Sequence, residues 1–288
     1  MTSQRSLELT SATALVVANM IGAGVFTTSG FLLEDLGSPL YVLLAWAVGG
    51  LQAALGALCY GALARRIPES GGEYLFLSRA LHPAAGYVAG WLSLFVGFSA
   101  PLAAAAFAFG AYARPWFGGA PPALAGTALI LAFAAIHSSE VRRGAQVQNG
   151  AVLLKVILIL VFVAYAAGRT PGLAVDSPPP FPAAAFGVSL VWISFSYSGW
   201  NAAVYVGGEI REPERTIPRS LILGTAIVTV LYLALNAVFV LSAPAADLAG
   251  KLEVGRIAAR AIGGAALEEA VAGLIALVLL SSVSSLVM

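Results

Sequence analysis

The chain has 288 residues, of which 59% are apolar and 10% are charged, and its mean hydropathy is +0.89. Water-soluble globular domains do not carry so much apolar surface, so the composition excludes that class and predicts an integral membrane protein surrounded by lipid. The formal net charge of +1 excludes a broad basic surface of the kind that binds nucleic acid. Cys59 is the only cysteine, which excludes an intrachain disulfide and a thiolate metal cluster.

Eight apolar runs along the chain have the length and composition of membrane-spanning helices. A bilayer core about 30 Å thick needs roughly 20 mostly apolar helical residues. A helix satisfies its own backbone polar groups in lipid, and none of the runs shows the alternation of a barrel strand. The sequence therefore predicts an all-α bundle of about eight transmembrane helices, with approximate limits at residues 11–33, 39–64, 84–112, 121–137, 147–168, 183–207, 218–242 and 265–288.

The charges of the connections predict the orientation of these helices. Cytoplasmic connections of membrane proteins are enriched in Lys and Arg. An N-terminus in the cytoplasm places nine arginines on the inner side, against five basic residues on the outer side, so we expect the N-terminus to be cytoplasmic. The segment 71–82, which mixes charged and apolar residues, is expected to lie at the inner interface. The nine arginines are Arg5, Arg65, Arg66, Arg79, Arg142, Arg143, Arg211, Arg215 and Arg219.

The first apolar run contains a glycine-rich interruption at Ile21, Gly22, Ala23 and Gly24. Two glycines flanking an alanine allow the backbone to unwind and to expose N–H and C=O groups at membrane depth, where a polar ligand can satisfy them. The same glycines could instead permit close packing of two intact helices. Both interpretations remain open for this run alone.

The sixth apolar run carries a second, polar interruption, which includes Ser196, Gly199 and Asn201. These polar groups are costly in lipid unless they face a partner or a cavity. Paired interruptions at corresponding positions of two structural units indicate the substrate site of a transporter. The N-terminal ends of broken helices attract a carboxylate and the C-terminal ends attract an ammonium group, so the pattern favours a zwitterionic amino acid.

Three stretches together resemble the amino acid-polyamine-organocation transporters, close to the L-type amino acid transporter branch. They are residues 21–26 (IGAGVF), residues 67–74 (IPESGGEY) with Gly90-Trp91 downstream, and residues 195–218 (FSYSGWNAAVYVGGEIREPERTIP). The resemblance implies a leucine-transporter-type inverted-repeat fold in one transmembrane domain. Helices one to five of the first repeat would occupy residues 1–170, and residues 183–288 would hold helices six to eight of an incomplete second repeat. It also implies residence in the plasma (inner) membrane.

The same resemblance implies roles for residues at both interruptions. The backbone of Gly22, Ala23 and Gly24 would bind the substrate carboxylate. The carbonyls near Ile21 and of Phe195 and Ser196 would bind the amino group. Phe195 falls where the family has an aromatic gate, although a single membrane phenylalanine otherwise packs against lipid or core. Gly199 and Asn201 belong to the same motif, and Asn19 and Asn236 are expected to form hydrogen bonds between helices.

Lys155 lies about eight residues inside the fifth run, roughly 12 Å from its inner end. An ammonium group at that depth must pair, lose its proton or reach the interface along its stem. In similar proton-coupled members, a lysine at this place stands where sodium-coupled relatives bind sodium, which favours protons as the coupling ion. A serine patch in the eighth run, including Ser281 and Ser282, could face Lys155 or form hydrogen bonds within its own helix.

The chain departs from the family pattern because it stops at Met288, inside the eighth run. We therefore expect a truncated gene product or an incomplete piece of a longer chain. The leading hypothesis is a secondary amino acid transporter that is a symporter or an exchanger. The alternatives are a non-transporting membrane fragment or subunit and a carrier of polyamines or other organic amines. The sequence shows no nucleophile, base and orienter set and no metal spacing, so neither an enzyme nor a cofactor is expected.

Overall fold

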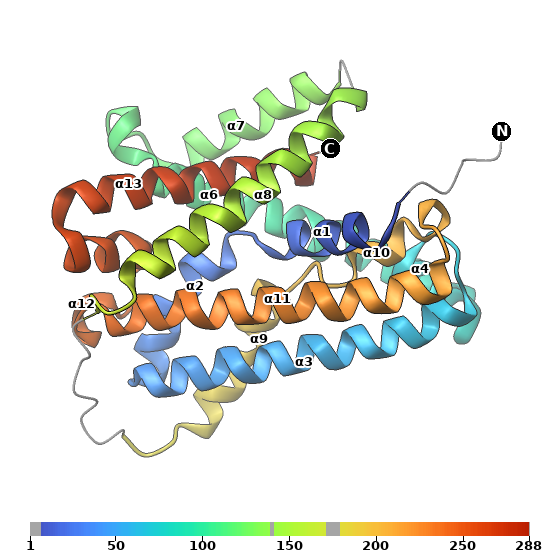
Figure 1. Ribbon diagram of the computed structural model, residues 1–288, viewed down its shortest axis with the longest axis horizontal. Coiled ribbons are helices and arrows are strands. Elements are labelled where there is room, and N and C mark those ends of the chain that lie inside the picture. Colours follow the sequence, from blue (N-terminus) through green and yellow to red (C-terminus); the bar gives the residue numbers. More distant parts are fainter. Residues whose placement is uncertain (1–6, 139–140, 171–178, 288) are drawn as a thin grey trace. The chain divides into compact units, whose positions relative to one another are not determined.

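The computed structural model describes residues 7–138, 141–170 and 179–287, without the side chains of residues 137, 141–152 and 285. Within these ranges the chain is helical, and its one extended pairing is a bridge between Leu7 and Ile210 (Figure 1). The α-helices are α1 (Leu9–Met20), α2 (Gly24–Leu36), α3 (Pro39–Arg66), α4 (Gly72–Ala80), α5 (Pro83–Leu92), α6 (Ala100–Tyr112), α7 (Pro122–His137), α8 (Val141–Ala166), α9 (Ala183–Ser196), α10 (Ala202–Tyr205), α11 (Pro213–Leu241), α12 (Ala245–Leu248) and α13 (Val254–Val287).

Three shorter helical segments complete the described secondary structure. The π-helix η1 (Ser93–Ser99) joins α5 to α6, so that Pro83–Tyr112 forms one long helical segment. The 3₁₀-helices η2 (Arg114–Phe117) and η3 (Gly207–Glu209) follow α6 and α10. A π-helix has a wider turn with i→i+5 hydrogen bonds, and in η1 the Ser99 hydroxyl also donates to the carbonyl of Leu94 at 2.8 Å.

Every apolar run identified in the sequence contains a helix, which confirms the all-α prediction for the described residues. Four helical segments are long and apolar enough to cross a membrane: α3, Pro83–Tyr112, α11 and Val254–Ser284. The pair α1 and α2 passes the same test as one broken span. The remaining apolar helices, Pro122–Ile136, Leu153–Ala166 and Ala183–Ser196, are shorter. The chain is therefore an integral membrane protein, and the number of eight spans stays a prediction.

The chain folds into two compact units, each built from three segments. Unit 1 comprises Met1–Ile21, Gly50–Pro101 and Tyr197–Val228, and unit 2 comprises Gly22–Gly49, Leu102–Ser196 and Thr229–Met288. Two of the boundaries between units fall inside the interruptions that the sequence predicts, after Ile21 and after Ser196. The units are described separately below.

In unit 1, helices α3 and α11 approach each other closely. A Cβ on Gly61 of α3 would lie 3.0 Å from Cβ of Pro218 in α11, so these helices pack tightly there.

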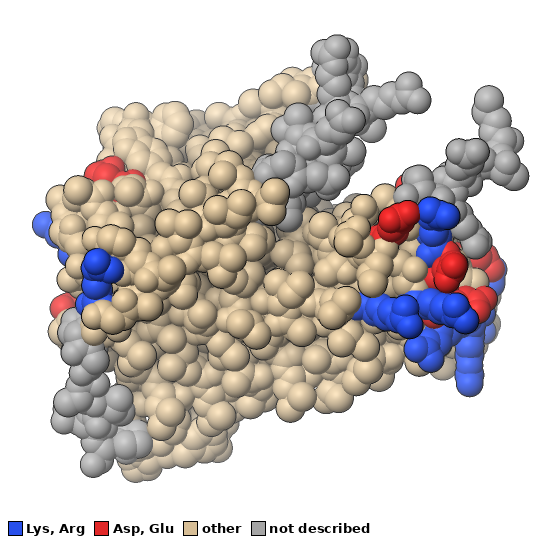
Figure 2. Space-filling view, viewed as in Figure 1, with Lys and Arg blue, Asp and Glu red and all other residues tan. Residues whose placement is uncertain are grey.

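Six of the predicted inner-side arginines are exposed in this unit: Arg65, Arg66, Arg79, Arg211, Arg215 and Arg219. On the face drawn in Figure 2, most charged side chains gather around the end of α3, α4 and the start of α11, and the middle of α3 and α11 is uncharged. Arg5 and the side chains of Arg142 and Arg143 lie outside the described residues.

Unit 2 contains a buried network of neutral hydrogen bonds. The indole N–H of Trp46 donates to the Ser29 hydroxyl at 2.9 Å, and Ser29 donates to the side-chain oxygen of Asn236. The Asn236 amide donates in turn to the carbonyl of Tyr232 at 2.8 Å. Because the network joins α2, α3 and α11, the prediction that Asn236 bonds between helices is confirmed. The same prediction for Asn19 is not matched by its described side-chain bond, which returns to the Leu15 carbonyl of its own helix.

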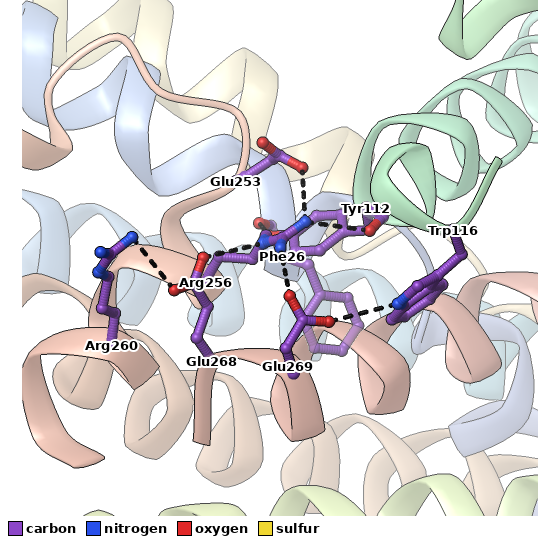
Figure 3. A network of polar contacts seen from close by, with 8 residues as sticks. All are labelled: Phe26, Tyr112, Trp116, Glu253, Arg256, Arg260, Glu268 and Glu269. Carbon is purple, nitrogen blue, oxygen red and sulfur yellow. Dashed lines mark hydrogen bonds and ion pairs between the residues drawn. The ribbon is translucent and has the colours of Figure 1, made fainter. Parts of the chain in front are cut away.

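A second network in unit 2 is charged and surrounds the start of α13 (Figure 3). The Arg256 guanidinium pairs with Glu268 at 3.4 Å and with Glu269 at 3.1 Å, and it donates to the carbonyl of Tyr112 at 3.3 Å. Glu253, just before the helix, lies 3.9 Å from the same guanidinium. Burial raises the pKa of the Glu253 carboxyl above its ordinary value, and the positive charge of Arg256 opposes that shift.

This network connects the two halves of a kinked helix. Gly263 and Gly264 have non-helical backbone angles, with φ of +71° at Gly264, so α13 changes direction between Arg256 and Glu268. The predicted eighth run begins near residue 265, whereas helix α13 already begins at Val254. The charged side chains suggest a loop, but in the fold Arg256 is satisfied by carboxylates from the following turns.

Candidate functional site

The first span is broken where the sequence predicts. Helix α1 ends at Met20, Ile21 leaves the helical region with φ −76° and ψ 89°, and α2 begins at Gly24. A Cβ on Gly22 would have no described atom within 4 Å, so close packing does not account for this glycine. A Cβ on Gly24 would lie 2.3 Å from the Ser196 hydroxyl oxygen, so this glycine permits a close approach. The close-packing interpretation thus applies to Gly24, and the binding of a ligand by the backbone at Gly22 stays a prediction.

The sixth span is broken as well. Helix α9 ends at Ser196, and the chain turns through Gly199, whose φ is +96°, before α10 begins at Ala202. A Cβ on Gly199 would lie 2.6 Å from the carbonyl oxygen of Asn19 in α1. Both the left-handed backbone and the close approach require glycine at this position.

In unit 2, the start of α2 lies beside the end of α9. The two helices pack together, and the hydroxyls of Thr28 and Ser196 are 3.0 Å apart. Among the described residues, the N–H groups of Gly24 and Val25 have no hydrogen-bond acceptor, as expected for the first turn of a helix. The positive end of one helix dipole therefore lies beside the negative end of another, and this pair of ends can bind a carboxylate and an ammonium group.

The carbonyl end of α9 also has a side-chain partner in unit 2. The hydroxyl of Tyr232 in α11 donates to the Ser196 carbonyl at 3.3 Å, and Ser196 is buried. Ile21, at the other interruption, is 1% exposed. Phe195, the predicted gate, is 48% exposed, which fits both a gate over the substrate and packing against lipid, so its role stays a prediction.

In unit 1, the carboxylate of Glu73, which the sequence motifs alone do not mark as a site residue, contacts the second break. Asn201 donates its side-chain amide to one oxygen of Glu73, and the hydroxyl of Tyr205 donates to the other oxygen. Glu73 lies in the first turn of α4, the short helix expected at the inner interface. A single Glu in an amphipathic segment ordinarily indicates a solvated face. Its position directly after Gly71-Gly72 was the available signal that the chain approaches another element closely.

Lys155 and the serine patch lie on two helices of unit 2 that pack against each other, α8 and α13 (Figure 1). The Lys155 side chain is 2% exposed, and Ser281 and Ser282 are 8% and 5% exposed. Ser282 donates to the Val278 carbonyl of its own helix at 3.0 Å. The Ser281 hydroxyl is buried without a hydrogen-bond partner among the described residues. Ser282 therefore forms an intrahelical bond and Ser281 does not, and the prediction that the serine patch faces Lys155 stays a prediction.

The comparison with protein families decides the broader class. A family described as amino acid permease matches residues 7–288, nearly the whole chain. The chain belongs to the amino acid permease family. This membership confirms the family resemblance that the sequence motifs indicate. It also supports amino acid transport across a membrane as the function of this family.

Relatives of this permease carry transporter names. The chain is 32% identical over 249 residues to the human b(0,+)-type amino acid transporter 1, covering 81% of this chain and 50% of the relative. It is 30% identical over 251 residues to the mouse Asc-type amino acid transporter 1, covering 82% and 47%. It is also 30% identical over 252 residues to the rabbit large neutral amino acids transporter small subunit 2, covering 82% and 47%. The chain thus spans about half the length of the curated relatives it matches.

Proposed function

We propose that this permease is a secondary active amino acid transporter that binds its substrate at the two broken spans and works by alternating access. The observation that carries the proposal is the pair of opposite helix ends in unit 2, where unpaired N–H groups of α2 lie beside the carbonyl end of α9. The relatives are named as transporters of amino acids, which supports a zwitterionic substrate and a function other than catalysis.

The residue roles follow from the polarity of these ends. Backbone N–H groups of Gly22, Ala23 and Gly24 would bind the carboxylate, since the start of α2 carries partial positive charge. The carbonyls of Ile21, Phe195 and Ser196 would bind the ammonium group. Gly199 and Asn201 would shape the unit 1 side of the second break, and Phe195 would cover the substrate. The inverted-repeat fold, with repeats at 1–170 and 183–288, belongs to the same proposal.

Ion coupling is proposed for Lys155 together with Ser281 and Ser282. A buried ammonium group on a helix that packs against a serine-bearing helix can take up and release a proton during the transport cycle. We expect Lys155→Ala to abolish uptake driven by a pH gradient while sparing exchange of internal for external amino acid. Proteoliposomes loaded with or without unlabelled substrate separate these two activities. Unchanged concentrative uptake would contradict a coupling role for Lys155.

The charge distribution supports a cytoplasmic N-terminus in the plasma (inner) membrane. The exposed arginines of unit 1 gather at the ends of α3 and α4 and at the start of α11, as the inner-side assignment requires (Figure 2). A membrane-impermeant reagent on a cysteine introduced at Arg65 in right-side-out vesicles tests this orientation. Labelling without permeabilisation would reverse it.

The binding proposal is tested by substitution at Gly24. A leucine there would overlap Ser196 and block the approach of α2 to α9, so we expect Gly24→Leu to abolish binding of labelled leucine, alanine and arginine to the purified chain. Gly187→Leu is the matched control, because Gly187 lies in α9 and a Cβ there has no described atom within 4 Å. Binding that survives Gly24→Leu would contradict the proposed site. A wild-type chain that binds no amino acid would instead favour a non-transporting fragment or subunit.

A further inference from the structure

Tyr112, the last residue of α6, is a buried polar side chain to which the proposed site gives no role. Its hydroxyl donates to the backbone carbonyl of Phe26 at 2.9 Å, and Phe26 lies in the first turn of α2. Both residues belong to unit 2, and they are 0% and 1% exposed. A hydrogen bond in such surroundings is not exchanged for one with water, so it fixes the start of α2 against the end of α6.

The same tyrosine also contacts the start of α13 (Figure 3). The backbone carbonyl of Tyr112 accepts from Nη1 of Arg256 at 3.3 Å. A Cβ on Gly255 would lie 3.4 Å from the Tyr112 hydroxyl oxygen, and the backbone N–H of Gly255 interacts with that oxygen. The first N–H groups of a helix have no acceptor within the helix, so a hydroxyl oxygen is well placed at the start of α13. Tyr112 therefore contacts the first turns of two helices that are far apart in the sequence.

The connection before α13 runs closely along the same part of α2. The N–H of Gly250 donates to the carbonyl of Gly30 at 2.9 Å. A Cβ on Gly30 would lie 1.9 Å from the carbonyl oxygen of Lys251, so only glycine allows this approach. Gly30 lies about one helical turn beyond Phe26, so the two carbonyls are on the same side of α2. The connection is thus bound to this side directly at Gly30 and through Tyr112 at Phe26.

The start of α2 needs support from its neighbours because the chain before it is not helical. Ala23, at the N-cap position, forms no side-chain cap, and a helix start without a cap frays readily. The N–H of Phe26 donates to the carbonyl of Ala23 at 3.0 Å, so Phe26 closes this first turn. On the side of α9, the hydroxyls of Thr28 and Ser196 lie 3.0 Å apart. The Phe26 carbonyl is therefore the point at which α6 and the start of α13 hold the first turn.

We propose that Tyr112 is a positioning residue that holds the first turn of α2 against the start of α13, so that the N–H groups of this turn are ordered before a substrate carboxylate binds. The inference rests on the proposed function and deepens it, because it names the residue that orders the carboxylate-binding helix end. Tyr112 acts through the Phe26 carbonyl and does not touch the substrate. Groups that are already ordered bind more tightly, since binding then costs less conformational entropy.

The first test needs no substrate and compares Tyr112→Phe with Tyr41→Phe by hydrogen–deuterium exchange of the purified chain. Tyr41 is a matched control in unit 2, because its hydroxyl also donates to a backbone carbonyl, that of Pro179 at 2.7 Å, but in an exposed position. We expect Tyr112→Phe to speed exchange roughly tenfold in residues 24–30 and in residues 250–256. Tyr41→Phe should leave both segments unchanged. Faster exchange in residues 250–256 alone, or in neither segment, would overturn the proposal.

The second test separates ordering of the carboxylate-binding end from a general structural effect. Leucinol has the amine and the side chain of leucine, but it carries a hydroxymethyl group in place of the carboxylate. We expect Tyr112→Phe to weaken equilibrium binding of labelled L-leucine about fivefold, as for the loss of one hydrogen bond, and to leave the affinity for competing leucinol unchanged. Equal losses for leucine and leucinol would refute a positioning role, and so would an unchanged affinity for leucine.

A measurement on the wild-type chain keeps the proposal falsifiable if Tyr112→Phe does not fold. Because Tyr112 joins the two helix starts, leucine that orders the first turn of α2 should slow exchange in residues 24–30 and also in residues 250–256. Protection confined to residues 24–30 would count against Tyr112. If the wild-type chain binds no leucine, the proposed function fails, whereas the exchange comparison of Tyr112→Phe with Tyr41→Phe still decides whether Tyr112 holds these helix starts together.

Discussion

Each unit contains a contact between the two broken spans: α2 with α9 in unit 2, and α1 with the turn at Gly199 in unit 1. The side chains around these two contacts differ in charge. In unit 2, α9 ends against the start of α2, and buried hydroxyls and amides surround the contact. In unit 1, α1 ends against the turn at Gly199, and the nearby polar anchor is the carboxylate of Glu73. The contact between α2 and α9 in unit 2 relies on neutral groups, and the contact near Gly199 in unit 1 has a charged group beside it.

This difference has a physical consequence. Ser29 and Asn236 are fully buried, and a satisfied neutral network at low dielectric is rigid and insensitive to salt. Glu73 and its donors are only half-buried, and a charged acceptor responds to substitution of a single partner. We therefore expect the contact between α2 and α9 in unit 2 to set the geometry of the broken spans. The Glu73 contact in unit 1 is expected to orient the side chain of Asn201.

The largest expected effect concerns Gly199 in unit 1. Alanine there must adopt a φ of +96° and would approach the Asn19 carbonyl to 2.6 Å, so Gly199→Ala should lower the free energy of unfolding by about 4 kcal/mol. Thermal unfolding in detergent measures the change, and Gly187→Ala is the control. Similar melting of the two variants would show that the turn at Gly199 is not tightly constrained.

The next effect concerns the neutral network of unit 2. Asn236→Leu leaves the buried Ser29 hydroxyl without its acceptor and should cost about 2 kcal/mol. Asn19→Leu is a matched control, because Asn19 is exposed and bonds only within its own helix among the described residues; it should cost less than about 0.5 kcal/mol. Chemical denaturation in micelles gives both values. Equal losses would remove the distinction between a buried and a local amide.

A smaller effect separates two arginines. Arg256 in unit 2 is largely buried among three carboxylates, and Arg256→Gln should cost about 1–2 kcal/mol (Figure 3). Arg79 in unit 1 is half exposed, and Arg79→Gln should cost less than about 1 kcal/mol. The Arg79 effect should vanish in high salt and the Arg256 effect should persist. The opposite salt dependence would contradict the burial of Arg256.

The smallest effect is the pH dependence that arises from Glu253. Its pKa is raised in the folded chain, so the folded state binds a proton more readily than the unfolded state. The resulting stability is present below the unfolded pKa and is lost as the pH rises through the folded pKa. Glu253→Gln should flatten this part of the stability profile, as followed by thermal unfolding between acidic and neutral pH. A profile unchanged by Glu253→Gln would assign the dependence to another group.

Local features of the fold could be predicted well from the sequence. Apolar length located each helix, and the glycines and polar residues located both breaks, because these patterns reflect backbone demands in lipid. The early start of α13 was missed because Arg256 and Arg260 look like loop residues until Glu268 and Glu269 pair with them. Such pairing depends on the kink at Gly263 and Gly264, which a linear pattern does not reveal.

The candidate site was predictable only in part. The motifs identified the two broken spans, and the proposed roles of their residues stay predictions. Glu73 could not be assigned because its partner Asn201 is 128 residues away, and only the folded chain brings them together. Likewise, the sequence leaves packing and unwinding as alternatives for the glycine pair, and the structure shows a close approach only at Gly24.

The π-helix η1 bears on how this permease compares with its relatives in sequence. A π turn contains an extra residue, so residues on either side of Ser93–Ser99 do not follow one continuous α-helical periodicity. The segment Pro83–Tyr112 therefore accommodates an extra residue within one continuous helical segment. Alignments that show a one-residue gap here would mark family members whose corresponding helix is uniformly α-helical.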